Sequence, residues 1–279
     1  MQQGIHYGIP AHVYHNADAV SASALDDMER SPAYARAQQL TYRAPTAAME
    51  WGTAVHCAVL EPDQLAKRYA EDPQHPDGGY PAGWRNTKDY RAQKSALVAQ
   101  GFGLLTPDQL DHLDIIQQNV AANPVAALIA KAQGGAEVSV YAEDVMFGLW
   151  RKCRPDLLIP DAGMVVDVKV SADISAHGFA RACSTYNYHR RAAFYLDTLK
   201  MVSDVKWAHY LFLVVASDLP YEVRAFTLDV DSVELGTEEY LFLMERYAQC
   251  IEAGAWPLGG ESIEEVRLPQ YRFNRAEEF

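Results

Sequence analysis

The stretch CRPDLLIPDAGMVVDVKVS, residues 153–171, places three charged side chains on two segments that otherwise have the composition of buried strands. Asp167 and Lys169 alternate with three valines, so both side chains lie on one face of their predicted strand. The turn at residues 160–163 predicts a β-hairpin between the two segments. Folding back about this turn brings Asp156 close to Asp167, within reach of a common cation.

Isolated ionised side chains are costly to bury, so these three charges need partners. Two neighbouring carboxylates repel, and one would become protonated without a counter-charge. A divalent cation removes this conflict, and oxygen ligands without cysteine favour magnesium or manganese over zinc. The alternative is an exposed hairpin whose charges form a weak surface salt-bridge cluster, worth about 0–1 kcal/mol. The spacing alone leaves both interpretations open.

The composition excludes several other classes of protein. The 279-residue chain has 24 basic and 37 acidic residues, a net charge of −13. This balance argues against a general nucleic-acid binder, although it permits DNA binding in one basic channel. The N-terminus has no signal-peptide pattern, and no run approaches the roughly 18 apolar residues that span a bilayer, so we expect a cytoplasmic protein without membrane contact. The four cysteines are far apart and predict free thiols.

The order of segments predicts a mixed α/β (α+β) fold, with a central mixed β-sheet flanked by helices. Ser21 or Ser23 is expected to cap an early helix, with Pro32 ending it or starting the next. Thr106 and Gln109 predict a capping box. Strands are expected at 136–144, 148–160, 163–171, 207–217 and 221–229, the first three as a meander, and later helices at 175–184, 186–202 and 238–254.

Seven ordered motifs extend this pattern: SASALDDMERSPAY, WGTAVHCAVLEP, AEVSVY, CRPDLLIP, VVDVKVSADI, YHRRAAFY, and the final LFLVVAS with AWP. Together they resemble the PD-(D/E)xK nuclease superfamily, and more closely the RecE-type exonucleases (exonuclease VIII family) of phage recombination systems. The resemblance covers residues 21–257 and implies a restriction-endonuclease-like core. It implies one domain over 1–279, with a mainly helical part (1–135), a catalytic sheet core (136–230), and a C-terminal helix and tail (231–279).

The resemblance also implies roles for five residues. Asp156 and Asp167 match the metal-binding carboxylates, and Lys169 matches the lysine that orients or helps to deprotonate the attacking water. His56 matches a metal-ligating histidine; the alternative is a histidine of the apolar helix core. Glu137 matches an acidic catalytic residue at the start of the first site strand; the alternative is an exposed glutamate at a strand end.

The predicted helix at 186–202 is a candidate DNA-binding element. Tyr188, Arg191 and Tyr195 are spaced to share one helical face. Tyr195 matches the family's tyrosine, but Arg191 stands where the family has a glutamine. An arginine suits phosphate recognition, while the alternative is an amphipathic helix with solvated arginines. The candidates for a basic DNA channel are Arg85, Lys88, Arg190 and Arg191, of which the first two follow a loop that either faces DNA or is simply solvated.

The function that the resemblance implies is metal-dependent exonucleolytic cleavage of linear double-stranded DNA, 5′ to 3′, with Mg²⁺ as cofactor and Mn²⁺ as substitute. The chain contains no GxxxxGK[ST] motif, so ATP independence is expected. The expected partners are double-stranded DNA ends, further copies of the chain in a ring, and a RecT-like single-strand annealing protein. Two alternatives remain at this point: a restriction-like or structure-selective endonuclease, and a catalytically silent DNA-end-binding module.

Overall fold

The computed structural model describes residues 1–41, 44–132, 134–259, 263 and 265–268. The helices of this part are α1 (Ala11–Asn16), α2 (Ala22–Arg30), α3 (Pro32–Leu40), α4 (Ala47–Leu60), α5 (Leu65–Arg68), α6 (Lys88–Ala99), α7 (Pro107–Ala122), α8 (Pro124–Lys131), α9 (Ala176–Thr185), α10 (Tyr188–Lys200) and α11 (Val230–Ala253). The strands are β1 (Gly4–His6), β2 (Tyr69–Glu71), β3 (Gly103–Leu105), β4 (Gly135–Ala136), β5 (Ser139–Asp144), β6 (Leu149–Cys153), β7 (Leu157–Ile159), β8 (Met164–Ser171), β9 (His209–Ala216) and β10 (Val223–Thr227).

Local signals in the sequence place the starts of α2, α3 and α7 correctly. Ser21 accepts a hydrogen bond from the backbone N–H of Ala24 and caps α2, and Pro32 begins α3. Thr106 and Gln109 form the capping box of α7. Such caps satisfy N–H groups that have no partner inside the helix. Helix α11 begins at Val230, eight residues before the predicted segment, because Asp229 caps it there.

The central sheet has five strands in the order β10-β9-β8-β7-β4. Strands β8 and β9 are parallel and the other neighbouring pairs are antiparallel, so the sheet is mixed as predicted. Strands β7 and β8 form the predicted hairpin, with Leu157 opposite Val166. Gly163 closes the turn with a φ of 57°, a conformation that glycine adopts without strain.

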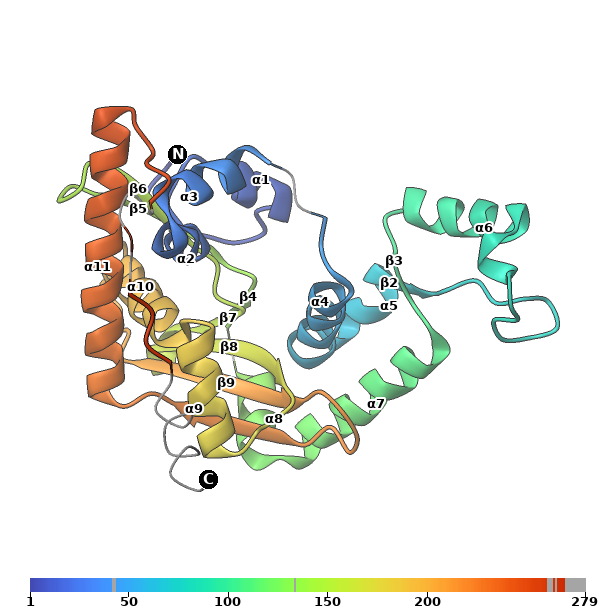
Figure 1. Ribbon diagram of the computed structural model, residues 1–279. Coiled ribbons are helices and arrows are strands. Elements are labelled where there is room, and N and C mark those ends of the chain that lie inside the picture. The colour runs from blue at the N-terminus through green and yellow to red at the C-terminus, as the bar shows by residue number, and fades with distance from the viewer. Residues whose placement is uncertain (42–43, 133, 260–262, 264, 269–279) are drawn as a thin grey trace, which may run out of the picture.

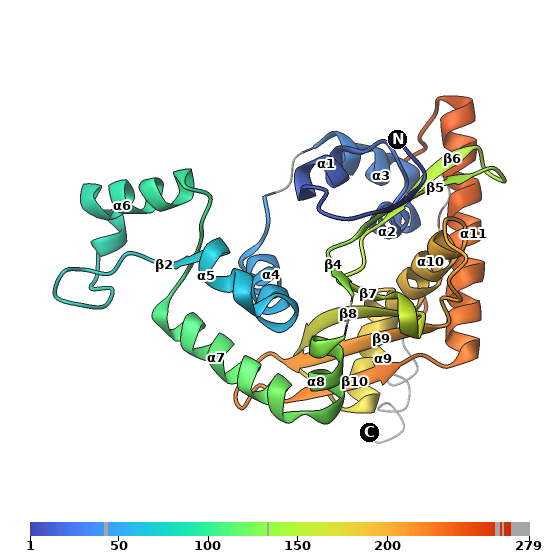
Figure 2. The same ribbon diagram turned by 180° about the vertical axis from the view of Figure 1, so that it is seen from behind.

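Helices cover both faces of this sheet. On one face, Val165, Phe212 and Val214 pack in a core cluster with α2, α10 and α11. On the other, Val166 and Val168 pack with α4, α7 and α8. This alternation along β8 is the period-two pattern that the sequence shows. In Figures 1 and 2, the long helix α11 runs along one side of the molecule, and α6 lies at the opposite end.

The predicted three-strand meander is wrong. Strands β5 and β6 pair with each other and with β1 in a separate three-stranded sheet, whereas β7 belongs to the central sheet. The segment expected as one strand at 148–160 therefore breaks at residues 154–156, where the chain passes from one sheet to the other. Pro155 lies at this break, and proline cannot donate a hydrogen bond to a strand ladder.

No helix in the described ranges is both long and apolar enough to cross a membrane.

Candidate active site

Asp156 occupies the break between the two sheets, one residue before β7 begins. Pairing between β7 and β8 ends at Leu157 and Val166, which leaves the next part of this edge of β8 without a partner from β7. The backbone N–H of Val168 there donates to Oδ2 of Asp156 at 2.7 Å. The hairpin therefore fixes this carboxylate by replacing a strand hydrogen bond with a side-chain one.

Glu137 reaches the same place from the short segment between β4 and β5. Its φ is 51°, a left-handed conformation that is uncommon outside glycine, and its N–H donates to the carbonyl of Asp156 at 2.9 Å. Arg154 Nε donates to Oε2 of Glu137 at 2.8 Å, and Arg154 Nη1 donates to Ser139 and to the carbonyl of Ile9 at 3.0 Å each. Glu137 is thus held in an unusual backbone conformation and oriented by an arginine.

His56 comes from α4, in the helical layer on the opposite face of the sheet from α10. Its Nδ1 lies 3.3 Å from Oδ2 of Asp156. Burial alone would lower the pKa of His56, but Asp156 outweighs burial and the pKa of the imidazole is raised. Burial would raise the pKa of Asp156, but His56, Lys169 and the Val168 N–H lower it to about 2. His56 is therefore a residue of α4 that also forms an ion pair with Asp156.

His56, Glu137 and Asp156 offer ligand atoms that all lie within 4.8 Å of one another. Two ligands on opposite sides of one Mg²⁺ are about 4 Å apart, given metal–oxygen distances of about 2.0–2.1 Å. The donor set, one imidazole nitrogen and two carboxylate oxygens, suits a divalent ion and leaves positions for water or substrate. These residues therefore fit a divalent metal ion.

Asp167 and Lys169 lie beside this group on β8, with their side chains paired to each other. Burial and the neighbouring Asp156 raise the pKa of Asp167, while Lys169 opposes the shift. The Lys169 ammonium also lies 5.2 Å from the centre of the Tyr188 ring on α10. Of the predicted metal ligands, the structure groups His56 and Asp156 with Glu137, and it places Asp167 nearer to the lysine.

Arg191, His56 and Lys169 face a common cavity of about 540 Å³. Its other lining residues are Asp26, Ala48, Met49, Gly52, Val168, Val170, Thr185, Tyr186, Asn187 and Tyr188. The Arg191 guanidinium lies 5.8 Å from the centre of the Tyr188 ring and 3.9 Å from Asp26. Tyr195 lies further along α10 and lines a second cavity, of about 830 Å³, together with Glu137 and Arg191. One face of α10 thus borders the site, as its spacing predicts.

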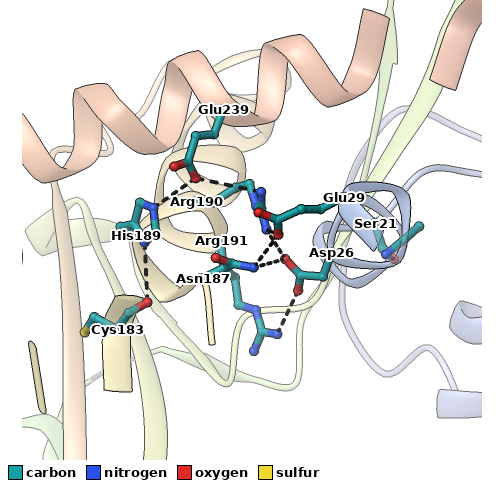
Figure 3. Close-up of polar contacts among 10 residues, drawn as sticks. Ser21, Asp26, Glu29, Cys183, Asn187, His189, Arg190, Arg191 and Glu239 are labelled. Atoms are coloured by element: carbon teal, nitrogen blue, oxygen red, sulfur yellow. Dashed lines mark hydrogen bonds and ion pairs between the residues drawn. The ribbon is translucent and has the colours of Figure 1, made fainter. Parts of the chain in front are cut away.

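Arg190 does not suit the predicted role in DNA binding. Its side chain is only 2% exposed, does not line the cavity, and lies in a cluster between α2, α10 and α11 (Figure 3). It donates to Asp26 and Glu29 and lies 3.7 Å from Glu239. His189 also contacts Glu239, at 3.0 Å. These carboxylates balance the buried guanidinium charge, so Arg190 holds three helices together.

Arg85 and Lys88 lie away from the site, at the end of the molecule where α6 is found (Figures 1 and 2). Arg85 is half-exposed, pairs with Asp72 at 2.9 Å and stacks 4.5 Å from the centre of the Tyr80 ring. Lys88 is the exposed first residue of α6. The structure does not bring either residue to the cavity.

Two residues of the site were not predicted. Arg154 orients Glu137, and its position two residues before Asp156 in the motif RPD could have drawn attention to it. Asp26 lines the cavity and lies close to both Arg190 and Arg191. Its signal is weak, because it belongs to the charged run DDMER on an amphipathic helix, where acidic residues are usually solvated.

A hairpin that carries PD and DVK beside an acidic donor group, on a mixed sheet between helical layers, is the arrangement of the PD-(D/E)xK nuclease superfamily. The chain belongs to the family described as PDDEXK-like domain of unknown function (DUF3799), whose model matches residues 21–269. No curated protein matches the chain.

Solved structures also resemble the chain. A candidate exonuclease from Eubacterium rectale aligns with a TM-score of 0.59 at 12% identity, over 95% of this chain and 96% of that one. A phage-related exonuclease from Haemophilus somnus 129PT aligns with a TM-score of 0.35 at 12% identity, over 87% and 100% of the two chains. At this identity the first likeness establishes the fold, and the nuclease class follows from the family.

Proposed function

We propose that this protein is a RecE-type, Mg²⁺-dependent and ATP-independent exodeoxyribonuclease that degrades linear double-stranded DNA, with Mn²⁺ able to replace Mg²⁺. The observation that carries the proposal is the group of His56, Glu137 and Asp156 beside Lys169. Three candidate metal ligands and an amine are the components that phosphodiester hydrolysis needs, and His56 and Lys169 of this group line the cavity.

The three donors would hold a divalent ion, which supplies Lewis-acid chemistry: it lowers the pKa of water and neutralises charge on the phosphate. The Lys169 side chain orients the attacking water or a phosphate oxygen from the β8 side. A positioned acid or base supplies about 10²- to 10⁴-fold, whereas enzymes reach accelerations of about 10¹⁷-fold, so electrostatic stabilisation must supply most of the rest. The pairing of Lys169 with Asp167 keeps the lysine at the site before DNA binds.

Arg191 is the proposed phosphate-binding residue. Its guanidinium lines the cavity together with Lys169 and His56. A planar guanidinium binds two phosphate oxygens at once and carries a positive charge, whereas the glutamine expected from the family is neutral. The centre of the Tyr188 ring lies 5.2 Å from the Lys169 ammonium and 5.8 Å from the Arg191 guanidinium. We therefore assign Arg191 to the DNA backbone next to the scissile bond.

The finer parts of the proposal follow from the resemblance. We propose 5′-to-3′ degradation that exposes a 3′ strand for recombination, a ring-shaped homo-oligomer around the DNA, and a single-strand annealing protein as partner. The net charge of −13 supports an arrangement in which the few cations face DNA and acidic residues face solvent. Labelling the 5′ or the 3′ ends of a duplex separates the two polarities.

The decisive experiment compares linear and covalently closed plasmid DNA with Mg²⁺ and no ATP. We expect the linear form to be degraded, the closed form to survive, and EDTA to stop the reaction. Lys169→Ala should lower the rate about 10²- to 10⁴-fold. Lys200→Ala is the matched control, because Lys200 is a half-exposed lysine at the far end of α10. Cleavage of the closed form would favour an endonuclease, and equal rates for wild type and Lys169→Ala would refute the mechanism.

A further inference from the structure

Asp26 stands between the two arginines of α10. Its Oδ1 accepts a hydrogen bond from Arg190 at 2.9 Å and one from the Asn187 side chain at 3.3 Å. Its Oδ2 lies 3.9 Å from Arg191 (Figure 3). The two oxygens of one carboxylate therefore face different partners, one in the buried cluster and one at the cavity.

The contact with Arg191 is the weaker of the two. In the described part of the chain the Arg191 guanidinium makes no hydrogen bond, and its closest anionic contact is the 3.9 Å approach to Asp26. Its five N–H donors are therefore available, in a side chain that is only 26% exposed. A phosphate oxygen in the cavity would be a stronger partner, because charge-assisted hydrogen bonds form at about 2.7–2.9 Å.

Asp26 itself lines the cavity that contains Lys169 and His56. A carboxylate in this position attracts Arg191 and also repels a phosphate group. Charges in a partly buried site are screened less by salt than charges at the surface, so both effects persist at physiological ionic strength. Any DNA phosphate that binds Arg191 must compete with Asp26.

We propose that Asp26 is a competing anion that restrains Arg191 when no DNA is bound, weakens DNA binding and speeds product release. Asp26 is a positioning residue that acts through Arg191. The proposal rests on the proposed phosphate contact of Arg191 and adds a carboxylate that competes with that contact.

The first test measures binding of a fluorescein-labelled blunt DNA duplex by anisotropy, in EDTA so that no cleavage occurs. Asp26→Asn keeps an oxygen that accepts from Arg190 and Asn187 but removes the charge. We expect its Kd for the duplex to fall about fivefold, the scale of one ion pair. In an Arg191→Met background the same change should have a clearly smaller effect, because only the direct repulsion between Asp26 and phosphate remains. The proposal is overturned if Asp26→Asn leaves Kd unchanged or weakens binding, or if its effect is equal in both backgrounds.

Glu29→Gln is the matched control. Glu29 accepts from Arg190 and from Asn187, as Asp26 does, but it does not line the cavity. Its substitution should leave Kd within twofold of wild type, and an effect as large as that of Asp26→Asn would refute a specific role for Asp26. If Asp26→Asn does not fold, Asp26→Ser removes the same charge with a smaller side chain and is judged by the same outcomes.

Steady-state kinetics on linear duplex DNA with Mg²⁺ supply the second test. Asp26→Asn should lower KM and kcat together, because tighter binding also slows release of product. A purely structural role would lower kcat without lowering KM. If cleavage fails in wild type but Asp26→Asn still tightens DNA binding through Arg191, the nuclease proposal is refuted and the proposal for Asp26 stands. If wild type cleaves DNA normally but Asp26→Asn has no effect, the nuclease proposal stands and the proposal for Asp26 is refuted.

Discussion

Arg190 and Arg191 are neighbours on one helix, yet their environments are opposite. Arg190 is 2% exposed and contacts carboxylates of α2 and α11. Arg191 is 26% exposed, faces the cavity beside Lys169, and has one carboxylate at 3.9 Å. The first arginine uses its charge to hold the fold, and the second keeps its charge available to a ligand. The comparison shows that a dipeptide RR cannot be read as one functional unit.

The helix itself separates the two side chains. Successive residues of an α-helix point about 100° apart, so Arg190 and Arg191 leave α10 in different directions, and Asp26 contacts both through different oxygens. The close approach of α11 fixes which one is buried. A Cβ at Gly236 would lie 2.5 Å from the carbonyl oxygen of His189, so glycine is what allows α11 to pack here. Glu239, one turn further along α11, then reaches both His189 and Arg190.

Removing the buried arginine should have the largest effect on stability. Arg190→Met leaves Asp26, Glu29 and Glu239 without their shared cation. Breaking a buried pair costs about 3–5 kcal/mol, and we expect the lower end, about 3 kcal/mol, because these carboxylates are partly exposed. Urea unfolding followed by tryptophan fluorescence measures the loss. Arg191→Met is the control and should change the free energy of unfolding by less than about 1 kcal/mol. Equal losses would break the contrast between the two arginines.

Replacing the cavity arginine should instead affect DNA binding. Arg191→Lys keeps the charge but loses the planar fork that binds two phosphate oxygens. Hydrogen bonds to charged groups contribute about 1.5–3 kcal/mol, so we expect Kd for duplex DNA to rise about tenfold or more, with little change in stability. Anisotropy with a labelled duplex in EDTA provides the measurement. Unchanged affinity in Arg191→Lys would show that charge alone matters at this position.

Much of the fold could be predicted because its signals are local. The alternation of valines with Asp167 and Lys169 gave the two faces of β8, and the turn at 160–163 gave the hairpin. The caps at Ser21 and Thr106 gave two helix starts. The passage of the chain between two sheets at 154–156 was missed. Strand composition does not say which strand a segment pairs with, since that depends on contacts distant in sequence.

Site residues that belong to a sequence motif could be predicted. The orientation of side chains that depends on helix packing could not. The motifs indicated His56, Asp156 and Asp167 as metal ligands and Glu137 as a catalytic residue. The structure brings together ligand atoms of His56, Glu137 and Asp156. The same motifs indicated Arg190 as a DNA contact, although it is buried. Whether a charged side chain faces a cavity or a neighbouring helix depends on how α2 and α11 pack against α10. That arrangement is a property of the tertiary structure, which no single stretch of sequence contains.

The smallest expected effect separates the two carboxylates that share Arg190. The hydrogen bond from Arg190 lowers the pKa of Glu29, whereas burial raises the pKa of Asp26. A lowered pKa contributes stability above the ordinary value, about 4.3 for glutamate, which is lost as the pH falls through the folded-state pKa. A raised pKa contributes stability at low pH, which is lost as the pH rises through the folded-state pKa.

Glu29→Gln should therefore flatten the acid side of the stability curve, and Asp26→Asn should steepen it. Both changes are expected to be small, because the Glu29 side chain is 54% exposed and solvent screens its ion pair. Urea midpoints of wild type and both variants between pH 3 and pH 7 provide the measurement. If the two variants shift the acid side in the same direction, Asp26 does not carry the burial cost that distinguishes it from Glu29. Opposite shifts would show that burial disfavours the ionised form of Asp26 but not that of Glu29. This is the property expected of a carboxylate that phosphate displaces from Arg191.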